Sequence, residues 1–279
     1  MQDRLLAPLT YVMVTTEKLL HTTVLNDEQR EAVEVIHQAA IDAFSLTRRM
    51  IRRYESSGAQ ALYGAAHDWL TPSGNIISYC DLLLTGITGK LRANVEGEIE
   101  TIFYKTHALR RQMINLIDYG WLQADQDAYF KTFALQELLQ PDMLPSQSDL
   151  TLHWYISDTL PPVYSSKLLL HHSMVDLLAN AYEFTPVGEI IVEARDLGHH
   201  LQITVSDTGI GIPYTEQRHI FEAFRKVDPN SSGLGLGLFI ARAFIEKQGS
   251  RLRVDSEPEE GSTFTFTVPL AHAAAPPDG

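Results

Sequence analysis

Hydrophobic residues recur at helical spacing through the first part of the chain. Between residues 4 and 56 the apolar positions lie three or four apart, except for a break around residues 21 to 26. This pattern predicts two helices that form an antiparallel hairpin. Residues 63 to 120 repeat the pattern, with a first helix through residue 84, a glycine-containing break, and a second helix over about 95 to 119.

The two hairpins resemble each other position by position. A shift of 64 residues places Pro8 on Pro72, and a shift of 66 residues places Val33 on Ile99. Such self-similarity is typical of an internal duplication, here with a slightly longer second turn. Chance similarity between amphipathic helices is the alternative.

The pattern changes from about residue 129. Short runs rich in β-branched and aromatic residues, such as "TLHWYI", "EIIVEA", "LQITVSD" and "TFTFTVPL", alternate with apolar helical segments. Strands interleaved with helices predict an α+β sandwich in which helices cover one sheet.

Composition mainly excludes functions. The chain has 279 residues, a net charge of −13 and no block of Lys or Arg, which argues against nucleic acid or an anionic membrane as the main partner. Cys80 is the one cysteine, so an internal disulfide is excluded and a reducing compartment is favoured. There is no apolar run of membrane-spanning length and no signal-peptide pattern. We therefore expect a cytoplasmic protein or a cytoplasmic fragment.

The segment "DTGIGIP" follows a predicted strand directly. Gly209 and Gly211 permit a tight turn and a close approach to a flat ligand. Asp207, at the end of the strand, offers a carboxylate to a ring amino group. By itself the motif is equally compatible with a simple turn.

A second glycine-rich segment, "SSGLGLGLFIARAFIEKQG", opens a predicted apolar helix with Gly233, Gly235 and Gly237. The start of a helix presents backbone N–H groups without helical partners and the positive end of the helix dipole, which favour a phosphate group. A flexible hinge is the alternative for this segment alone.

The segment "DLLANAYEFTP" places polar residues on one side of a predicted helix. Asp176, Asn180 and Glu183 lie at positions i, i+4 and i+7. Their oxygens suit a hard cation such as Mg²⁺ that bridges phosphates. For any one of these residues, a solvated helix face is the simpler interpretation.

Upstream, the motif "HDWLTP" begins the second hairpin. His67 is followed by Asp68, and Thr71 lies four residues after the histidine on the same helical face, just before Pro72. A neutral imidazole is nucleophilic near pH 7, but a lone histidine on a helix is more often structural.

Taken together, these motifs resemble the core of bacterial two-component sensor histidine kinases. The glycine segments, the "FEAFRKVD" run between them and the closing "EEGSTFTFTVPL" resemble the ATP-binding domain of that family over roughly residues 129 to 270. "HDWLTP" and its hairpin resemble the preceding phosphoacceptor domain. The implied fold is a multidomain chain of helical hairpins in a four-helix bundle, followed by an α+β sandwich of the histidine-kinase ATPase type. Its expected domains are residues 1–57, a degenerate hairpin without the histidine; 63–122, the dimerisation and phosphoacceptor hairpin; and 129–271, the catalytic domain.

The resemblance implies a role for each matching residue of the hairpin. His67 would accept the γ-phosphoryl group of ATP, and Asp68 would orient its ring and help to remove a proton. Thr71, with Asp68, would position a water molecule for dephosphorylating a partner. The phosphoryl group would pass to an aspartate on the receiver domain of a response regulator.

In the ATP-binding domain the resemblance implies ATP with Mg²⁺, or alternatively Mn²⁺. Asn180 matches the metal-binding asparagine, and Asp176 stands where the family has a further asparagine. Asp207 would read the adenine amino group. The remaining expected nucleotide contacts are the two glycine boxes and a cation from the lid over residues 213–233, namely Gly209, Gly211, Gly233, Gly235, Gly237, Arg225 and Lys226.

Some positions depart from the family pattern. Asp176 and Glu183 bring two carboxylates near the expected triphosphate, which puts nucleotide affinity and metal preference in question. Leu70 replaces an arginine, and Ser73 replaces an apolar residue. A catalytically weak or inactive scaffold that binds a response regulator or another kinase is therefore the alternative, and a gyrase-like or chaperone-like ATPase clamp is a third.

The first hairpin has Asp3 where the second has His67. One hypothesis is that the two hairpins pack on each other as a pseudo-dimer within one chain. The other treats the first hairpin as a signalling helix pair in an ordinary homodimer. In either case the input would come from a sensor or partner that the sequence does not identify.

Overall fold

The structure is a computed structural model, and it divides into two compact units. Unit 1 comprises residues 1–125 with 232–234, and unit 2 comprises residues 126–231 with 235–279. The side chains of residues 63, 66 and 67 are not described. The described backbone covers residues 2–63, 66–141, 143, 150–228, 231 and 233–273.

Unit 1 is helical, as the apolar spacing predicted. Its described helices are α1 Gln2–Thr22, α2 Asp27–Ser57, α3 Gln60–Tyr63, α4 Ala66–Leu84 and α5 Ala93–Gln123. The break between α1 and α2 ends in a capping box: Asn26 accepts a hydrogen bond from the Gln29 backbone, and the Gln29 side chain accepts one in return. This reciprocal pair satisfies N–H groups that the first turn of a helix leaves without partners. Both α1 and α4 continue past an internal proline, Pro8 and Pro72 respectively.

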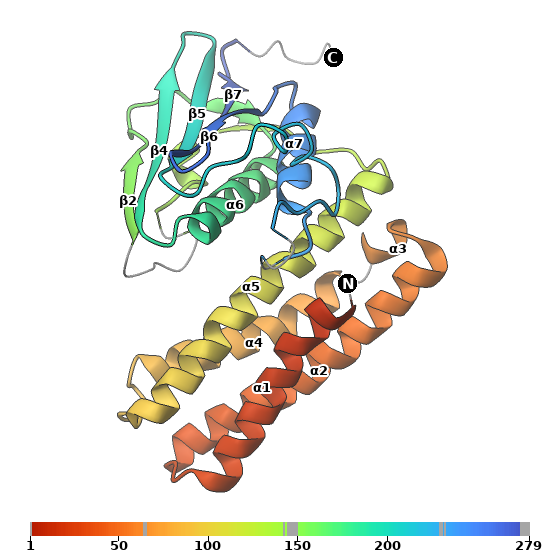
Figure 1. Ribbon diagram of the computed structural model, residues 1–279, viewed down its shortest axis with the longest axis vertical. Coiled ribbons are helices and arrows are strands. Elements are labelled where there is room, and N and C mark those ends of the chain that lie inside the picture. The colour runs from red at the N-terminus through yellow and green to blue at the C-terminus, as the bar shows by residue number, and fades with distance from the viewer. Residues whose placement is uncertain are drawn as a thin grey trace. The chain divides into compact units, whose positions relative to one another are not determined.

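The four long helices close into a bundle (Figure 1). Helix α2 packs on α1 and α4, and α5 packs on α4 and α1, so that each long helix has two neighbours. The short helix α3 packs on α2 and α5. No helix in the described part of the chain is long and apolar enough to cross a membrane.

The buried positions of the two hairpins correspond at the same shifts that align their sequences. Helices α1 and α4 correspond at a shift of 64, and α2 and α5 at a shift of 66. The pairs in which both side chains are buried are Leu5 and Trp69, Leu9 and Ser73, Val12 and Ile76, Thr16 and Cys80, Leu19 and Leu83, Gln29 and Val95, Val33 and Ile99, Ile36 and Ile102, Ala40 and Thr106, Ala43 and Leu109, Thr47 and Met113, Met50 and Leu116, and Ile51 and Ile117. Because each pair occupies the same core position, the correspondence supports an internal duplication.

Hydrogen bonds join the two hairpins at the turns and along the bundle. Asn26 donates through Nδ2 to the carbonyl of Thr88 at 2.8 Å, and Gln29 donates through Nε2 to the carbonyl of Gly89 at 3.1 Å. Farther along, the indole Nε1 of Trp69 donates to the hydroxyl of Thr47 at 2.8 Å, inside the core. The register between α2 and α4 is therefore fixed by polar contacts as well as by apolar packing.

Cys80 lies in this core, as expected for a packing residue. Its side chain is fully buried, and this burial raises the pKa of the thiol to about 12. The group therefore stays a protonated thiol at neutral pH, where the reactive form of cysteine is the thiolate.

Unit 2 is an α+β sandwich. Its main sheet has the order β2-β4-β5-β7-β6, in which β2 and β4 are parallel and the other neighbours are antiparallel. A small second sheet pairs β1 with β3. The described elements are β1 Lys131–Phe133, η1 Leu135–Glu137, β2 Leu150–Tyr155, β3 Val163–Ser165, α6 Lys167–Phe184, β4 Gly188–Asp196, β5 His200–Asp207, α7 Gly237–Lys247, β6 Arg253–Glu257 and β7 Gly261–Pro269.

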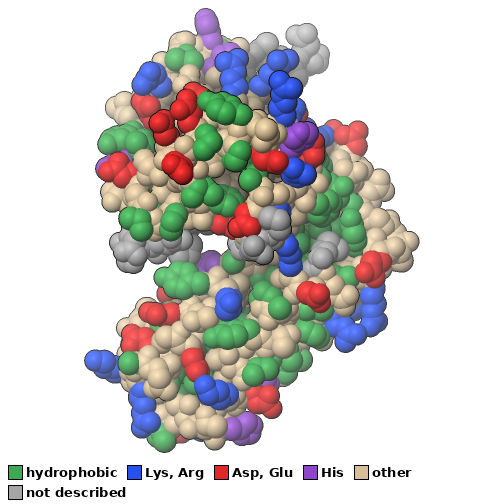
Figure 2. Space-filling view, viewed as in Figure 1, with side chains coloured by type: hydrophobic (Ala, Val, Ile, Leu, Met, Phe, Trp, Pro, Cys, Tyr) green, Lys and Arg blue, Asp and Glu red, His purple; other side chains and the backbone are tan. Residues whose placement is uncertain are grey.

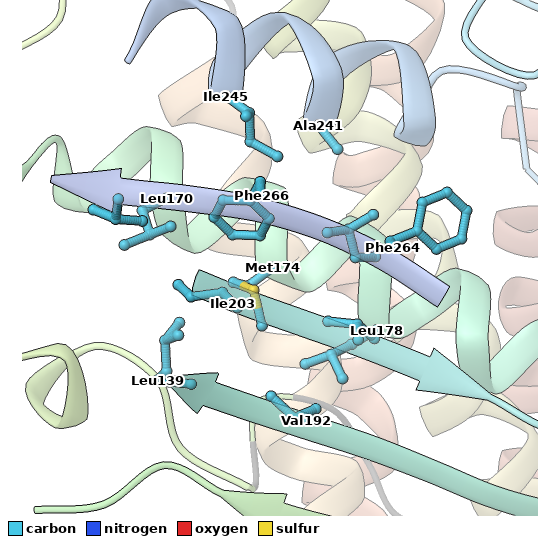
Figure 3. Packing of buried hydrophobic residues seen from close by; sticks show 14 of the residues in the cluster. Leu139, Leu170, Met174, Leu178, Val192, Ile203, Ala241, Ile245, Phe264 and Phe266 are labelled. Carbon is cyan, nitrogen blue, oxygen red and sulfur yellow. The ribbon is translucent and has the colours of Figure 1, made fainter. Parts of the chain in front are cut away.

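One face of the main sheet and the helices α6 and α7 enclose the core of unit 2 (Figure 3). Alternate residues of the strands, such as Val192, Ile203 and Phe266, point toward Met174 on α6 and Ile245 on α7. The residues between them face away and are mostly polar, as expected for a sheet with one covered face. The predicted fold class, a helical bundle followed by an α+β sandwich, is confirmed. The two short strands β1 and β3 were not predicted.

Charges of both signs lie on the face of the molecule that Figure 2 shows. Figure 2 shows acidic and basic side chains interspersed on the visible face, so the net charge of −13 does not gather there into one acidic patch.

Candidate functional site

Asp207 ends strand β5 and is the first of the expected site residues in unit 2. Its Oδ1 accepts hydrogen bonds from the backbone N–H of Gly209 at 2.9 Å and from the hydroxyl of Thr185 at 3.4 Å. Burial raises the pKa of this carboxyl, and hydrogen bonds from Gly209, Ser262 and Thr185 oppose that shift. The side chain is thus held in a fixed direction while remaining partly exposed.

The two glycines after Asp207 are required by close backbone contacts. A Cβ at Gly209 would overlap the carbonyl oxygen of Phe184 at the end of α6. Gly211 has a φ of +64°, and a Cβ there would overlap the carbonyl of Glu257. The sequence suggested that these glycines let the backbone approach a ligand. In the folded chain they let three backbone segments meet, which holds Asp207 at the edge of the sheet.

Helix α6 carries the three polar residues expected to bind a cation. Asp176 is only 1% exposed, whereas Asn180 and Glu183 are half-buried. The Nδ2 atom of Asn180 is buried, and no hydrogen-bond partner for it exists among the described residues. A buried N–H group normally has an acceptor, so the Asn180 amide nitrogen is suited to donate a hydrogen bond to a bound ligand.

The second glycine segment leads into α7. Gly233 and Gly235 have φ angles of +85° and +71°, and a Cβ at Gly235 would overlap the carbonyl of Arg225. Helix α7 begins at Gly237, and its N-cap residue, Leu236, makes no side-chain capping hydrogen bond. The first backbone N–H groups of α7 therefore receive no side-chain cap, which leaves them suited to an anion.

The two lid cations have partners within the lid. Arg225 donates to Glu216 at 2.7 Å, and Lys226 donates to the carbonyl of Ser231. To contact phosphate as expected, both side chains would have to break these hydrogen bonds and form new ones with phosphate oxygens. Within the described part of the chain, no group of three or more His, Cys, Asp or Glu side chains is arranged to hold a metal ion.

The "HDWLTP" motif lies at the start of α4 in unit 1. His67 is in the first turn, and its imidazole lies outside the described side chains. Asp68 and Thr71 are exposed on the helix surface. Ser73, one of the departures from the family pattern, is fully buried, and its hydroxyl donates to the carbonyl of Leu70 at 2.9 Å. Its polar group is thereby satisfied inside the bundle.

A groove of about 690 Å³ runs beside this motif, between α2 and α4. Asp68 and Thr71 line one wall together with Pro72 and Asn75. The opposite wall comes from α2 of the first hairpin and includes Gln38, Asp42, Ser45 and Arg49. Sequence reasoning did not select these α2 residues. Their spacing of three and four does place them on one helix face, but only the packing of α2 on α4 brings that face beside the motif.

The comparisons with known proteins agree on one class of protein. Residues 166–272 match the family described as histidine kinase-, DNA gyrase B-, and HSP90-like ATPase, so unit 2 contains an ATPase domain of this class. Sensor histidine kinase RcsC of Salmonella typhimurium is 30% identical over 231 residues, which cover 79% of this chain and 24% of that protein. Adaptive-response sensory kinase SasA of Synechococcus sp. CC9311 is 34% identical over 142 residues, covering 49% of this chain and 37% of that protein.

A solved structure shares the fold. Full-length ShkA, crystallised in complex with AMPPNP, has 23% identity and a TM-score of 0.54, and the match covers 77% of this chain and 46% of that one. The chain is thus a relative of the two-component sensor histidine kinases and has their type of ATPase domain. The predicted resemblance is confirmed, and the matched region spans about a quarter to two fifths of the length of the two curated relatives.

Proposed function

We propose that this chain is the phosphotransfer core of a two-component sensor histidine kinase. It binds ATP in unit 2, accepts the γ-phosphoryl group on His67, and passes that group to an aspartate on the receiver domain of a response regulator. The observation that carries the proposal is the combination in unit 2 of a fixed Asp207 carboxylate, the buried Asn180 amide and the uncapped start of α7. One unit of the histidine-kinase ATPase class thereby offers an acceptor for the adenine amino group and N–H donors for phosphate oxygens.

Different residues of unit 2 contact different parts of ATP. Asp207 accepts a hydrogen bond from the adenine amino group, and its own bonds to Gly209 and Thr185 keep it oriented. The N-terminal N–H groups of α7, together with Gly235 and Gly237 of the second glycine box, hold phosphate oxygens.

Mg²⁺ fits the same unit. Asn180 and Asp176 would hold it, because this ion commonly takes one or two protein oxygens and completes its shell with water and phosphate. When bound, it neutralises charge on the phosphates. Because Asp176 is almost fully buried, Asn180 is the more accessible of the two ligands.

The reaction on His67 is a displacement at phosphorus. A nitrogen of the neutral imidazole attacks the γ-phosphorus, a P–N bond forms, the P–O bond to ADP breaks, and the ring loses its N–H proton with the help of Asp68. A carboxylate oxygen of the receiver aspartate then attacks phosphorus, and the P–N bond breaks as the imidazole regains a proton. In the reverse, phosphatase role, Thr71 and Asp68 orient a water molecule toward the phosphorylated aspartate.

Label transfer from ATP tests this function. The wild-type chain should acquire label from γ-labelled ATP with Mg²⁺, and none from α-labelled ATP.

Asp207→Asn should weaken nucleotide binding by about tenfold or more, because one carboxylate acceptor is replaced by an amide that can present an N–H to the adenine amino group. Lowering the pH should weaken ATP binding in the same way by protonating Asp207. Since burial raises the pKa of this carboxyl, the loss should begin at a higher pH than for an exposed aspartate.

The alternative function is a scaffold without kinase activity. It is favoured by the buried carboxylate of Asp176, which stands where the resembled family has an amide. Binding of a receiver domain without label on the wild-type chain, with either Mg²⁺ or Mn²⁺, would support the scaffold over the kinase.

We also propose that the two hairpins form a pseudo-dimer, in which the first hairpin is a degenerate copy. A phosphoacceptor hairpin cannot bury its apolar stripe alone, and here α1 and α2 cover the stripe of α4 and α5. Sedimentation velocity should therefore give a monomer of 31.3 kDa at micromolar concentration. A dimer that persists on dilution and loses helix content only when it dissociates would contradict the pseudo-dimer.

A further inference from the structure

The groove between α2 and α4 joins the two hairpins at one level of the bundle. Thr47 on α2 accepts the indole hydrogen bond of Trp69 on α4, and both side chains are fully buried. Arg49 follows Thr47 by two residues, and Asp68 immediately precedes Trp69. This contact therefore sets Arg49 in the groove wall that faces Asp68 and Thr71.

The end of α2 beside this groove is positively charged. Arg48, Arg49, Arg52 and Arg53 are all exposed, and none of them forms an ion pair with any residue that the structure describes. Of the four, Arg49 lines the groove. Arginine binds phosphoryl and carboxylate oxygens in a planar, two-pronged geometry, so this side chain suits an acidic partner that receives or carries a phosphoryl group.

The corresponding place on the other side of the bundle carries a different set of side chains. The shifts that align the hairpins place Arg49 on Asn115, which is buried, and Ser45 on Arg111. They place Asp68 and Thr71 on Arg4 and Ala7. Between the matching faces of α1 and α5, Lys105 lies over the ring of Tyr11, with Nζ 5.1 Å from the ring centre.

A symmetric homodimer carries two equivalent faces, but in this bundle the α1 positions that match Asp68 and Thr71 carry neither an acid nor a hydroxyl. The two faces of the bundle are therefore not equivalent, and the groove beside the "HDWLTP" motif is the one between α2 and α4.

We infer that α2 of the first hairpin forms part of the phosphotransfer site, and that the groove seats one receiver domain per chain with Arg49 as a positioning residue. The inference rests on the proposed function for the identity of the partner. Arg49 binds acidic groups around the receiver's acceptor aspartate, while the Gln38-to-Ser45 stretch of α2 contacts the receiver surface and selects among receivers. The degenerate hairpin therefore acts as a specificity element as well as a packing partner.

Calorimetric titration of the unphosphorylated full chain tests this inference without depending on kinase activity. The probe is the receiver domain that binds the wild-type chain most tightly in a panel of purified receiver domains. We expect one receiver per chain. Arg49→Glu should weaken binding by about tenfold or more, because it reverses the charge in the groove, and Gln38→Arg should weaken it by crowding the opposite end of the same wall.

Two matched variants separate the groove from general effects. Arg48→Glu makes the same charge change on the same helix outside the groove lining, and Tyr104→Arg alters the exposed position on α5 that corresponds to Gln38. Both should bind the receiver within about twofold of wild type. Arg49→Lys should retain more affinity than Arg49→Glu, since it keeps the charge.

A second measurement follows transfer from chains that have been labelled and freed of ATP. Arg49→Glu should pass label to the receiver at least about tenfold more slowly than Arg48→Glu. Two receivers per chain, equal losses for Arg49→Glu and Arg48→Glu, or no binding from any receiver would overturn the inference. Absence of label on the wild-type chain would overturn the kinase function alone, because the binding results decide the groove separately.

Discussion

His67→Gln should abolish the transfer of label from γ-labelled ATP to the chain. Glutamine is close to histidine in size and is a good helix former, so α4 should begin as before. It has no nucleophilic ring nitrogen, however, and cannot form the P–N bond. On the wild-type chain, the bound label should be lost in acid and kept in alkali, as expected for a phosphoramidate. Gel autoradiography after acid and alkali treatment measures both properties.

His21→Gln is the matched control for this experiment. His21 is an exposed histidine in the last turn of α1, and it belongs to none of the proposed sites. The control should label at the wild-type rate and bind nucleotide as tightly as wild type. Label that persists in His67→Gln, or label that is stable to acid, would identify another acceptor and contradict the assignment of His67.

The helical hairpins could be predicted because local sequence determines their limits. The spacing of apolar residues predicted the second long helix of the second hairpin over about 95 to 119, and α5 covers Ala93–Gln123. The break before α2 contains Asn26, whose side chain caps the helix. The alignment of the two hairpins was also readable, since burial on a helix follows its period.

Elements that depend on distant contacts could not be read in this way. Strands β1 and β3 are three residues each and pair with each other across about thirty residues of chain, so neither has a periodic pattern long enough to detect. The same limit applies to α6. Its spacing placed Asp176 and Asn180 on one side, but only the packing of the helix under the sheet buries the first and leaves the second half-exposed.

The glycine boxes show how one motif can have more than one physical cause. The sequence indicated that Gly209 and Gly211 make room for a ligand. In the folded chain both make room for other backbone segments, the end of α6 and the turn before β7. Spacing alone does not separate these causes, because either one requires a residue without a Cβ.

The groove beside "HDWLTP" marks the largest gap in the sequence reasoning. Its α2 wall lies on the hairpin that has Asp3 in place of the histidine, so no sequence motif predicted a role for Arg49. The contact between α2 and α4, in which Trp69 donates a hydrogen bond to Thr47, brings Arg49 beside the motif.

Trp69→Ala should cause a large loss of stability of the bundle. The indole is fully buried between the hairpins, and removing a buried tryptophan typically costs about 3 to 5 kcal/mol. Trp69→Phe should cost less, because it keeps most of the apolar contacts and removes the hydrogen bond to Thr47. Urea unfolding of the full chain, followed by far-ultraviolet circular dichroism, measures both changes.

Leu5→Ala provides the matched comparison, because Leu5 is the fully buried counterpart of Trp69 in the first hairpin. Its truncation should cost about 2 to 5 kcal/mol. If both hairpins share one core, each substitution should shift the same helical transition to lower urea, although the two residues belong to different copies. Two separate helical transitions, with Trp69→Ala moving one and Leu5→Ala moving the other, would mean that the hairpins fold independently. The first hairpin could then not supply a fixed wall for the groove beside Asp68, so this result would count against both the pseudo-dimer and the role of Arg49.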